Sequence, residues 1–588
     1  MTTPTRLGFA LAIVGGLLAV VPGMDDAYLL AKLLCLAAGG ALIWAGLLRR
    51  TPSRTALDGP LLALWSVMIL SAIGSVDPPA SVFGIYPQAF YGLLPLSLCA
   101  ALYYGAAASA EDDTAKDEIL SWMLAAAVPL GAFGIWQALF GDPLTRAPLP
   151  SGTRVFSTIG NPVMLGACLV LLCPLALDEA LRRKDRLLGA ASLGLILTSL
   201  VLTWSRGAWL SAAFAAAVYL WATGRLRIQR RAALALVLAA PLVFFALRRG
   251  LAKGPSDALR VETAKSALTA FAARPLLGFG PDTFLVLFRR YKTEEFMRLS
   301  HQANVGQFSA HNDILQAAAT LGFLGLLAYG WLLWALGARL YAPLSERSPD
   351  PRAAAIGAGL LGLFVQAKFN PIPVSALALA AILAGIVCRA RKSAPSAGRA
   401  GAVFAAAFCA ACALLLGRFC AANRLYLRGE RAVASNPVGG ADYMAGVGDL
   451  RRACELDPWR IEYLTKRVDV IFNVAEVAPP DQGRQLIDKA LELTAGGLRL
   501  HPGNPTAHEM RATALALAGR FGPKRMPEAL AEIKTASDLD PMFTFTLRRR
   551  MDIDRAAGDD ADFQRARLAY LRVIQLTGES PGWNSPNF

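Results

Sequence analysis

Long apolar segments fill most of the first 420 residues of this chain and leave little choice of fold. A segment that crosses about 30 Å of hydrocarbon needs roughly 20 mostly apolar residues, and in lipid only a helix or a closed barrel satisfies its backbone hydrogen bonds. We therefore predict an all-α, polytopic membrane protein with about 12–13 transmembrane helices. The expected spans are residues 7–22, 27–48, 59–76, 89–108, 118–140, 160–181, 187–204, 207–223, 231–248, 311–338, 353–369, 372–388 and 401–420.

The composition agrees with this class and excludes a soluble enzyme. Hydrophobic residues make up 55% of the 588 and charged residues 17%, and the mean hydropathy is +0.42. The net charge of +16 does not indicate nucleic acid, because the Lys and Arg residues cluster in short loops between the apolar segments. We therefore expect the lipid bilayer as a partner and no nucleic acid.

Basic residues follow every second span, which predicts the orientation of the chain. The loops at 22–26 and 75–79 carry no Lys or Arg, whereas cytoplasmic loops are rich in both. We expect a cytoplasmic N-terminus, with the loop at 249–310 and the tail after about residue 421 in the periplasm or outside the cell. The basic loop residues are Arg49, Arg50, Arg54, Arg182, Arg183, Lys184, Arg186, Arg225, Arg227, Arg230, Arg231, Arg389, Arg391, Lys392 and Arg399.

The tail has the pattern of a second, soluble domain. Three helical segments end at Pro458, Pro502 and Pro541, and amphipathic helices run between them. They resemble tetratricopeptide repeats, although their spacing is looser than that family's period of about 34 residues. We expect a transmembrane domain at 1–420, which includes the loop at 249–310, and a repeat domain at 421–588 that binds a partner or the acceptor and does no chemistry.

Three ionisable residues at membrane boundaries are candidates for a site. His311 begins one apolar span, Arg206 stands on a short turn between two spans, and Arg260 lies on an expected helix within the loop at 249–310. Each has a structural interpretation taken singly, as a boundary anchor, a solvated charge or a capping histidine. Together they suit one reaction: guanidinium groups match the oxygens of a diphosphate, and a neutral imidazole accepts the proton of a hydroxyl nucleophile.

These residues belong to a set of motifs in a fixed order. The motifs are Thr203-Trp204-Ser205-Arg206-Gly207-Ala208-Trp209-Leu210, then Arg260, then Pro275-Leu276-Leu277-Gly278-Phe279-Gly280-Pro281-Asp282-Thr283-Phe284, then His311-Asn312-Asp313-Ile314-Leu315-Gln316. The last motif is followed by Gly322 and Gly325. In this order the motifs resemble the bacterial O-antigen ligase family over roughly residues 150–340. An upstream segment at 154–162 is also similar, although Val163 stands where a second asparagine is usual.

The resemblance implies a metal-independent, inverting glycosyltransferase of the bacterial inner membrane that uses no cofactor. Such enzymes move a glycan from undecaprenyl diphosphate to lipid A-core, and relatives polymerise O-antigen or glycosylate proteins. By this resemblance Arg206 and Arg260 hold the donor diphosphate and His311 activates the acceptor hydroxyl. Weaker, supporting candidates are Arg154, Asn312, Asp313, Lys265, Arg274 and Arg289.

Other functions fit the sequence less well. Gly278-Phe279-Gly280 lacks the Gly-Lys-Ser/Thr of a phosphate loop, and His301 and His311 lack the spacing of zinc ligands, so we expect neither a nucleotide site nor a metal site. A transporter or flippase remains an alternative, but its charges would lie near the bilayer midplane. A scaffold, in which the repeats recruit an envelope complex and the membrane part is only an anchor, is a second alternative, but an anchor needs only one or two spans. The sequence leaves the acceptor open among lipid A-core, a protein and a growing glycan.

Overall fold

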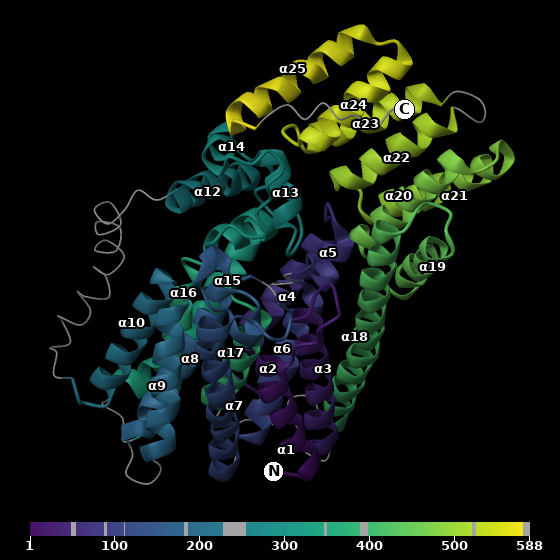
Figure 1. The fold of residues 1–588 in the computed structure, drawn as a ribbon. Helices are drawn as coiled ribbons and strands as arrows, with labels where there is room; N and C mark the ends of the chain where they lie inside the picture. The colour runs from purple at the N-terminus through teal and green to yellow at the C-terminus, as the bar shows by residue number, and fades with distance from the viewer. Residues whose placement is uncertain are drawn as a thin grey trace.

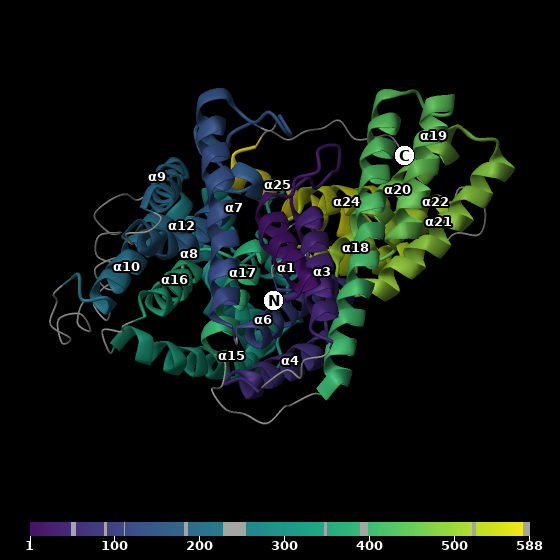
Figure 2. The same cartoon turned by 90° about the horizontal axis from the view of Figure 1, so that it is seen from below.

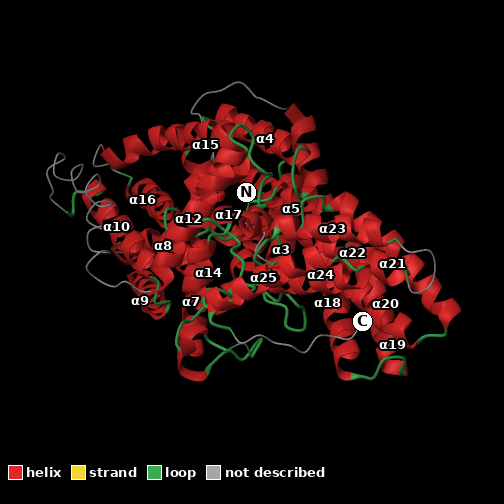
Figure 3. Ribbon diagram, turned by 90° about the horizontal axis from the view of Figure 1, so that it is seen from above, coloured by secondary structure: helices red, strands yellow, loops and turns green. Residues whose placement is uncertain are grey.

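The computed structural model of the chain describes residues 1–48, 54–87, 91–110, 112–146, 148–181, 186–226, 255–345, 350–388, 398–519 and 525–579. Within these ranges the chain forms helices and loops and no β-strand, as Figures 1 and 3 show. The predicted all-α class is therefore confirmed. The expected span at 231–248 lies outside the described residues.

The apolar helices form one bundle at the expected positions. Five are long and apolar enough to cross a membrane, at Leu29–Gly46, Asp113–Phe140, Pro162–Leu181, Asp313–Tyr341 and Arg399–Ser435, and the other apolar helices are shorter. This agrees with a polytopic membrane protein. The bundle helices are α1 Thr3–Ala10, continued by a π-helical turn at Leu11–Gly15 and by α2 Gly16–Leu18, then α3 Leu29–Gly46, α4 Asp58–Ile73, α6 Leu93–Ser109, α7 Asp113–Phe140, α8 Pro162–Leu181, α9 Arg186–Leu202, α10 Arg206–Ala222, α15 Asp313–Ser345, α16 Pro351–Ala367, α17 Val374–Val387 and α18 Gly398–Ser435.

The N-terminus and several of the expected cytoplasmic loops lie at one end of the bundle. The Met1 amino group is 4.0 Å from Asp112, which lies between α6 and α7. The Ala56 N–H, ahead of α4, donates to the Cys388 carbonyl, which follows α17. In Figure 1 this end is at the bottom, and helices α12–α14 and α22–α25 lie beyond the opposite end. Most of the basic loop residues lie outside the described residues, at 49–50, 182–184, 227–231 and 389–392.

The opposite end carries short helices from the loops and the helices of the tail. The loop helices are α5 Pro78–Phe83, α12 Pro255–Ala273, α13 Phe284–Tyr291 and α14 Glu294–Ser300. The tail helices are α19 Ala441–Leu456, α20 Ile461–Val477, α21 Pro480–Leu500, α22 Pro505–Ala518, α23 Met526–Leu539, α24 Thr544–Ala557 and α25 Asp560–Thr577. Each tail helix packs on the next. Three of them end two residues before Pro458, Pro502 and Pro541, where the sequence places helix ends.

Helix α18 runs from the membrane bundle directly into the tail. It has 38 residues, a length of about 57 Å at 1.5 Å per residue, well beyond the roughly 30 Å of hydrocarbon. It packs on α3 within the bundle, as the view in Figure 2 shows, and on α19 in the tail. Residue 420, where the sequence suggests a domain boundary, therefore lies inside a continuous helix.

The tail shares a hydrophobic core with the outer loops. Phe284 and Phe296 from the loop helices pack in one buried cluster with Leu547 and Tyr570 from the tail. Beside this cluster, Lys292 Nζ lies 2.9 Å from a carboxylate oxygen of Asp540, and each side chain is 1% exposed. A further contact joins the Gly503 N–H to the Val76 carbonyl at 2.8 Å. The tail is thus packed on the same loops that carry the sequence motifs.

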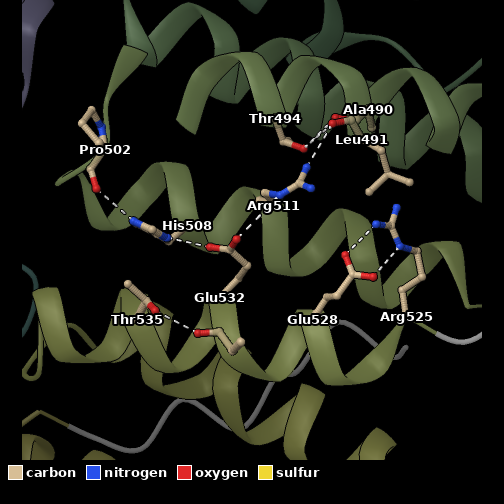
Figure 4. Close-up of polar contacts among 11 residues, drawn as sticks. Ala490, Leu491, Thr494, Pro502, His508, Arg511, Arg525, Glu528, Glu532 and Thr535 are labelled. Atoms are coloured by element: carbon tan, nitrogen blue, oxygen red, sulfur yellow. Dashed lines mark hydrogen bonds and ion pairs between the residues drawn. The ribbon is translucent and has the colours of Figure 1, made fainter. Parts of the chain in front are cut away.

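Within the tail, His508 serves a structural role between α22 and α23. Figure 4 shows its ring held at both nitrogens, with Nδ1 2.7 Å from Glu532 and Nε2 3.1 Å from the Pro502 carbonyl. Arg511 also approaches Glu532, at 3.7 Å. Because both ring nitrogens are engaged, His508 is not a candidate for catalysis.

Candidate functional site

The glycine-rich motif at 275–284 fastens a loop into a break in helix α15. At Gly322 the backbone leaves the helical conformation, with φ of +67° and ψ of −161°. The N–H groups of Phe323 and Leu324 donate instead to the carbonyls of Pro275 and Leu276, at 2.7 and 3.2 Å. A side chain at Gly322 would place its Cβ 2.5 Å from the Leu276 carbonyl carbon. The glycine is therefore required by both the backbone conformation and the close approach.

Helix α4 braces the same loop from the other side. The Ser71 hydroxyl donates to the carbonyls of Leu277 and Thr320, at 2.6 and 3.1 Å. The Gly280 N–H donates to Thr320 as well, at 3.0 Å. The motif recognised in the sequence is therefore mainly structural, and it fixes the first turns of α15 directly after His311.

His311 ends the loop before α15 and is held in one tautomer. Its Nε2 lies 3.1 Å from Gln307 Oε1, and its backbone N–H donates to the Ser309 hydroxyl. Because an amide oxygen only accepts hydrogen bonds, Nε2 carries the proton and Nδ1 keeps its lone pair. Nδ1 is buried and has no hydrogen-bond partner among the described residues.

The surroundings of His311 keep it neutral. Burial and then the charge of Arg260 lower the pKa of His311 to about 4. Both effects act against the imidazolium form, which is costly in a buried place and repelled by a guanidinium. At neutral pH the ring is therefore a free base with an available lone pair.

The two arginines are linked through α12 and the connection between α16 and α17. Arg206, the first residue of α10, lies with Nη2 3.3 Å from Asp257, and its side chain is 56% exposed. One turn further along α12, Arg260 Nη2 donates to Asn370 Oδ1 at 3.1 Å. A Cβ on Gly207 would lie 3.1 Å from Asn370 Nδ2, so the turn that carries Arg206 also packs on Asn370.

The connection between α16 and α17 also holds the start of α15, a feature that sequence reasoning missed. Lys368 Nζ lies 2.5 Å from an Asp313 oxygen, and the Lys368 carbonyl accepts from Asn312 Nδ2 at 3.1 Å. Tyr329 donates to Asp313 at 2.5 Å. Lys368 could have been found as an ionisable residue at a span boundary. Asn370 gives no such signal.

The supporting candidates divide into two groups. Asn312 and Asp313 belong to the network around His311, and Arg154 Nε donates to the Thr203 carbonyl at 3.0 Å, which braces the turn before Arg206. The other three make contacts elsewhere. Lys265 pairs with Glu262 at 2.6 Å, Arg274 donates to the Gly74 carbonyl at 3.3 Å, and Arg289 donates to the Thr506 hydroxyl at 3.1 Å.

An apolar cavity of about 310 Å³ opens beside this network. Helices α4, α6, α15 and α17 form most of its wall, with side chains such as Leu64, Met68 and Leu332. Asp282 and Asp313 stand among the few polar groups of the lining. Because Asp313 follows His311 by two residues, the cavity adjoins the candidate base.

The remaining histidines and carboxylates give no metal centre in the part of the chain that the structure describes. No group of three or more His, Cys, Asp or Glu side chains lies close enough there to hold an ion. His301 lies at the exposed end of α14, and His501 contacts Asp77.

The fold and site define a class: a polytopic helical membrane protein with a histidine and two arginines at one end of its bundle. Residues 191–330 match the family model described as O-antigen ligase, a range that contains Arg206, Arg260 and His311. A search of curated proteins found no match to the chain. The family match supports the resemblance to O-antigen ligases and indicates a membrane enzyme that transfers glycans. It does not reach the tail.

Proposed function

We propose that this protein is a membrane glycosyltransferase of the O-antigen ligase type. It moves a glycan from undecaprenyl diphosphate to a hydroxyl group of an acceptor on the periplasmic face of the bacterial inner membrane. The observation that carries this proposal is the free Nδ1 of a neutral His311 beside Arg260. Such a group is suited to accept the proton of a hydroxyl nucleophile.

The proposed reaction needs only the two substrates and the side chains of this protein. His311 Nδ1 accepts the acceptor's hydroxyl proton while the acceptor oxygen forms a bond to the anomeric carbon. The C–O bond to the diphosphate breaks at the same time, and the diphosphate leaves with the electron pair. Attack opposite the leaving group inverts the anomeric carbon. Gln307 keeps the proton on Nε2 and so keeps Nδ1 available throughout.

Arg206 and Arg260 hold the donor diphosphate and stabilise the charge that it gains on leaving. Guanidinium groups suit this role because they stay charged and bind two oxygens at once. Arg206 is more than half exposed and already faces an anionic group, Asp257, whose place a phosphate would take. In this proposal the arginines replace the divalent cation of other glycosyltransferases.

The apolar cavity suits the isoprenoid chain of the donor. Its lining is mostly aliphatic and aromatic, and Asp282 and Asp313 are among its few polar groups. A lipid tail in this cavity would bring its diphosphate to the membrane boundary, where the arginines lie. A helix bundle that crosses the membrane with its N-terminus in the cytoplasm would place this end and the tail in the periplasm.

The acceptor is the least constrained part of the proposal. Lipid A-core, a growing glycan and a protein side chain all offer hydroxyl groups, so the same site serves a ligase, an O-antigen polymerase or a protein O-oligosaccharyltransferase. We further propose that the helical tail, a degenerate tetratricopeptide-like array, binds a protein partner or the acceptor.

Deletion of the gene and mass analysis of the envelope test this proposal. Loss of a glycan from lipopolysaccharide, from a polymer or from an envelope protein would identify the acceptor. The wild-type gene should restore the glycan and the His311→Ala variant should not. An unchanged glycan profile, with a transported solute affected instead, would favour the transporter alternative.

A further inference from the structure

A second cavity, distinct from the apolar cavity of the proposed donor site, lies between the tail and the outer loops. Its volume is about 360 Å³, within the range of roughly 300–1,000 Å³ of small-molecule sites. Its walls come from α5 and the residues after it, from α13, from the middle of α18 and from the start of α20. Most of this lining lies outside the residues of the family match.

One wall of the cavity is aromatic. The rings of Phe83, Phe419 and Trp459 pack together, with centroids 5.0 Å apart for Phe83 and Trp459 and 6.0 Å for Phe419 and Trp459. Tyr86 and Tyr426 also line the cavity. Flat aromatic faces bind the C–H faces of sugar rings, because both surfaces are apolar and of similar size.

The rest of the lining offers donors and acceptors for hydroxyl groups. Arg460, whose side chain is 10% exposed, lies over the Tyr86 ring and bonds Asp457 through Nε, while its Nη1 has no hydrogen-bond partner among the described residues. The carboxylates of Glu462 and Asp469 are exposed side chains in the same lining. A buried donor without a partner is costly and marks a place where a ligand would bond.

The lining carries charges of both signs, which favours a neutral ligand. Four carboxylates stand against three cationic side chains and a histidine, so the cavity does not attract a phosphate or a strongly charged peptide. Neutral, polyhydroxylated molecules need such mixed donors and acceptors. The carboxylates are those of Asp77, Asp457, Glu462 and Asp469, the cations are Arg289, Arg460 and Lys466, and the histidine is His501.

The lining of this cavity contacts the lining of the apolar cavity that adjoins His311. Ile85 lines the second cavity, and the Ile85 N–H donates to an Asp282 oxygen at 3.0 Å, while Asp282 lines the apolar cavity next to the site. Phe308, three residues before His311, packs on Ile85 and Val286 from the same wall. In Figures 1 and 2 the arginine-bearing helix α10 lies on the other side of the molecule from α18.

We propose that this cavity binds one or two sugar units of a substrate glycan and so positions the chain for transfer at His311. The proposal rests on the proposed function, because the reaction supplies the glycans. The ligand is a neutral saccharide, from either the donor or the acceptor.

The test uses the purified full-length protein in detergent on an array of immobilised bacterial surface oligosaccharides. The wild type should bind a subset of the array. Trp459→Ala, which removes the stacking face, should weaken binding roughly tenfold or more, and Glu462→Gln should weaken it to a smaller extent. Phe545→Ala, which removes an exposed aromatic side chain elsewhere in the tail, should bind as the wild type does. Thermal melting checks that each variant is folded.

Two further arms separate the outcomes. His311→Ala should bind the array normally even though it fails to transfer. The test of glycan binding is therefore separate from the test of the proposed reaction. In a transfer assay, a raised KM of Trp459→Ala for the lipid-linked glycan would assign the cavity to the donor, and a raised KM for the acceptor would assign it to the acceptor. Absence of binding by the wild type, or unchanged binding by both Trp459→Ala and Glu462→Gln, would overturn the proposal.

Discussion

In the proposed mechanism, His311 can act as a base only while its imidazole is neutral. Burial and the charge of Arg260 lower the pKa of His311 to about 4, and a histidine is neutral above its pKa. As the pH falls, we therefore expect kcat/KM to hold through the usual histidine range near 6.5 and to be lost only at about pH 4. A profile of kcat/KM against pH measures this directly. An acid limb near pH 6.5 would contradict the assigned environment.

Gln307 provides a control for the same prediction. In Gln307→Glu a carboxylate would face Nε2 and stabilise the imidazolium, so the acid limb should move up by about one unit or more. In Gln307→Leu the tautomer is no longer fixed, and the rate should fall without that upward shift. Identical profiles for the two variants would show that residue 307 does not contact the base.

The arginines should not tolerate replacement by lysine. Arg206→Lys and Arg260→Lys keep the charge but lose the planar pair of donors, so each should lower kcat/KM roughly tenfold or more. Arg274→Lys is the matched control, because Arg274 is exposed, donates to the Gly74 carbonyl and lies over the Phe279 ring, apart from both site arginines. Steady-state kinetics with a lipid-linked donor measure kcat/KM for each variant. Full activity of both Arg206→Lys and Arg260→Lys would show that the arginines do not bind the donor.

The residues of the proposed site could be chosen from the sequence, whereas the groups that contact them could not. His311, Arg206 and Arg260 stand out because charges at the edge of apolar segments are costly. Asn370 is 110 residues from its partner Arg260, so only the fold brings them together. Gln307 lies close to His311 in the chain, but its role depends on a loop conformation that no periodic pattern encodes.

At the scale of elements, the break in α15 should depend on a glycine. Gly322→Ala forces a side chain into a left-handed conformation and against the Leu276 backbone, which should cost about 1–3 kcal/mol or more and displace the start of α15. Gly330→Ala is the control, because it lies in the same helix with no atom within 4 Å of its Cβ position. The melting temperature in detergent and the transfer activity should both fall for Gly322→Ala, and neither should fall for Gly330→Ala.

Helix positions follow from the sequence more closely than helix ends. Within the described residues, the expected apolar spans agree with the bundle helices because burial in lipid depends on hydrophobic length. The span expected at 401–420 continues to Ser435 as α18, because polar residues such as Asn423 extend the helix beyond the lipid and bond the outer loops. The short helices α5, α13 and α14 have too few residues for a span and were not predicted.

At the scale of the whole molecule, the tail and the outer loops should unfold together. Asp540→Ala leaves Lys292 buried without its partner, which should cost about 3–5 kcal/mol and reduce transfer as well, since Lys292 follows the loop helix α13. The double variant Lys292→Met/Asp540→Leu removes both charges and should recover most of the stability. Thermal melting measures the loss of stability in the single variant and its recovery in the double variant. A tail that melts separately from the loops would contradict the shared core.

This shared core changes how the role of the tail can be tested. The sequence suggests a separable domain, because the apolar spans stop and amphipathic repeats begin near residue 420. The structure packs Leu547 and Tyr570 of the tail against Phe284 and Phe296 of the loops. Truncation would expose these side chains, so substitutions within the tail are the sharper experiment.

Transfer by the purified protein tests the central claim, that His311 is the base of a metal-independent glycosyltransferase. The assay supplies a glycan on undecaprenyl diphosphate and an acceptor in the presence of EDTA, and it compares the wild type with His311→Ala. We expect the wild type to remain active and the variant to lose roughly two or more orders of magnitude in rate while melting normally. Full activity in His311→Ala, or loss of wild-type activity in EDTA with recovery on adding Mg²⁺, would contradict the account.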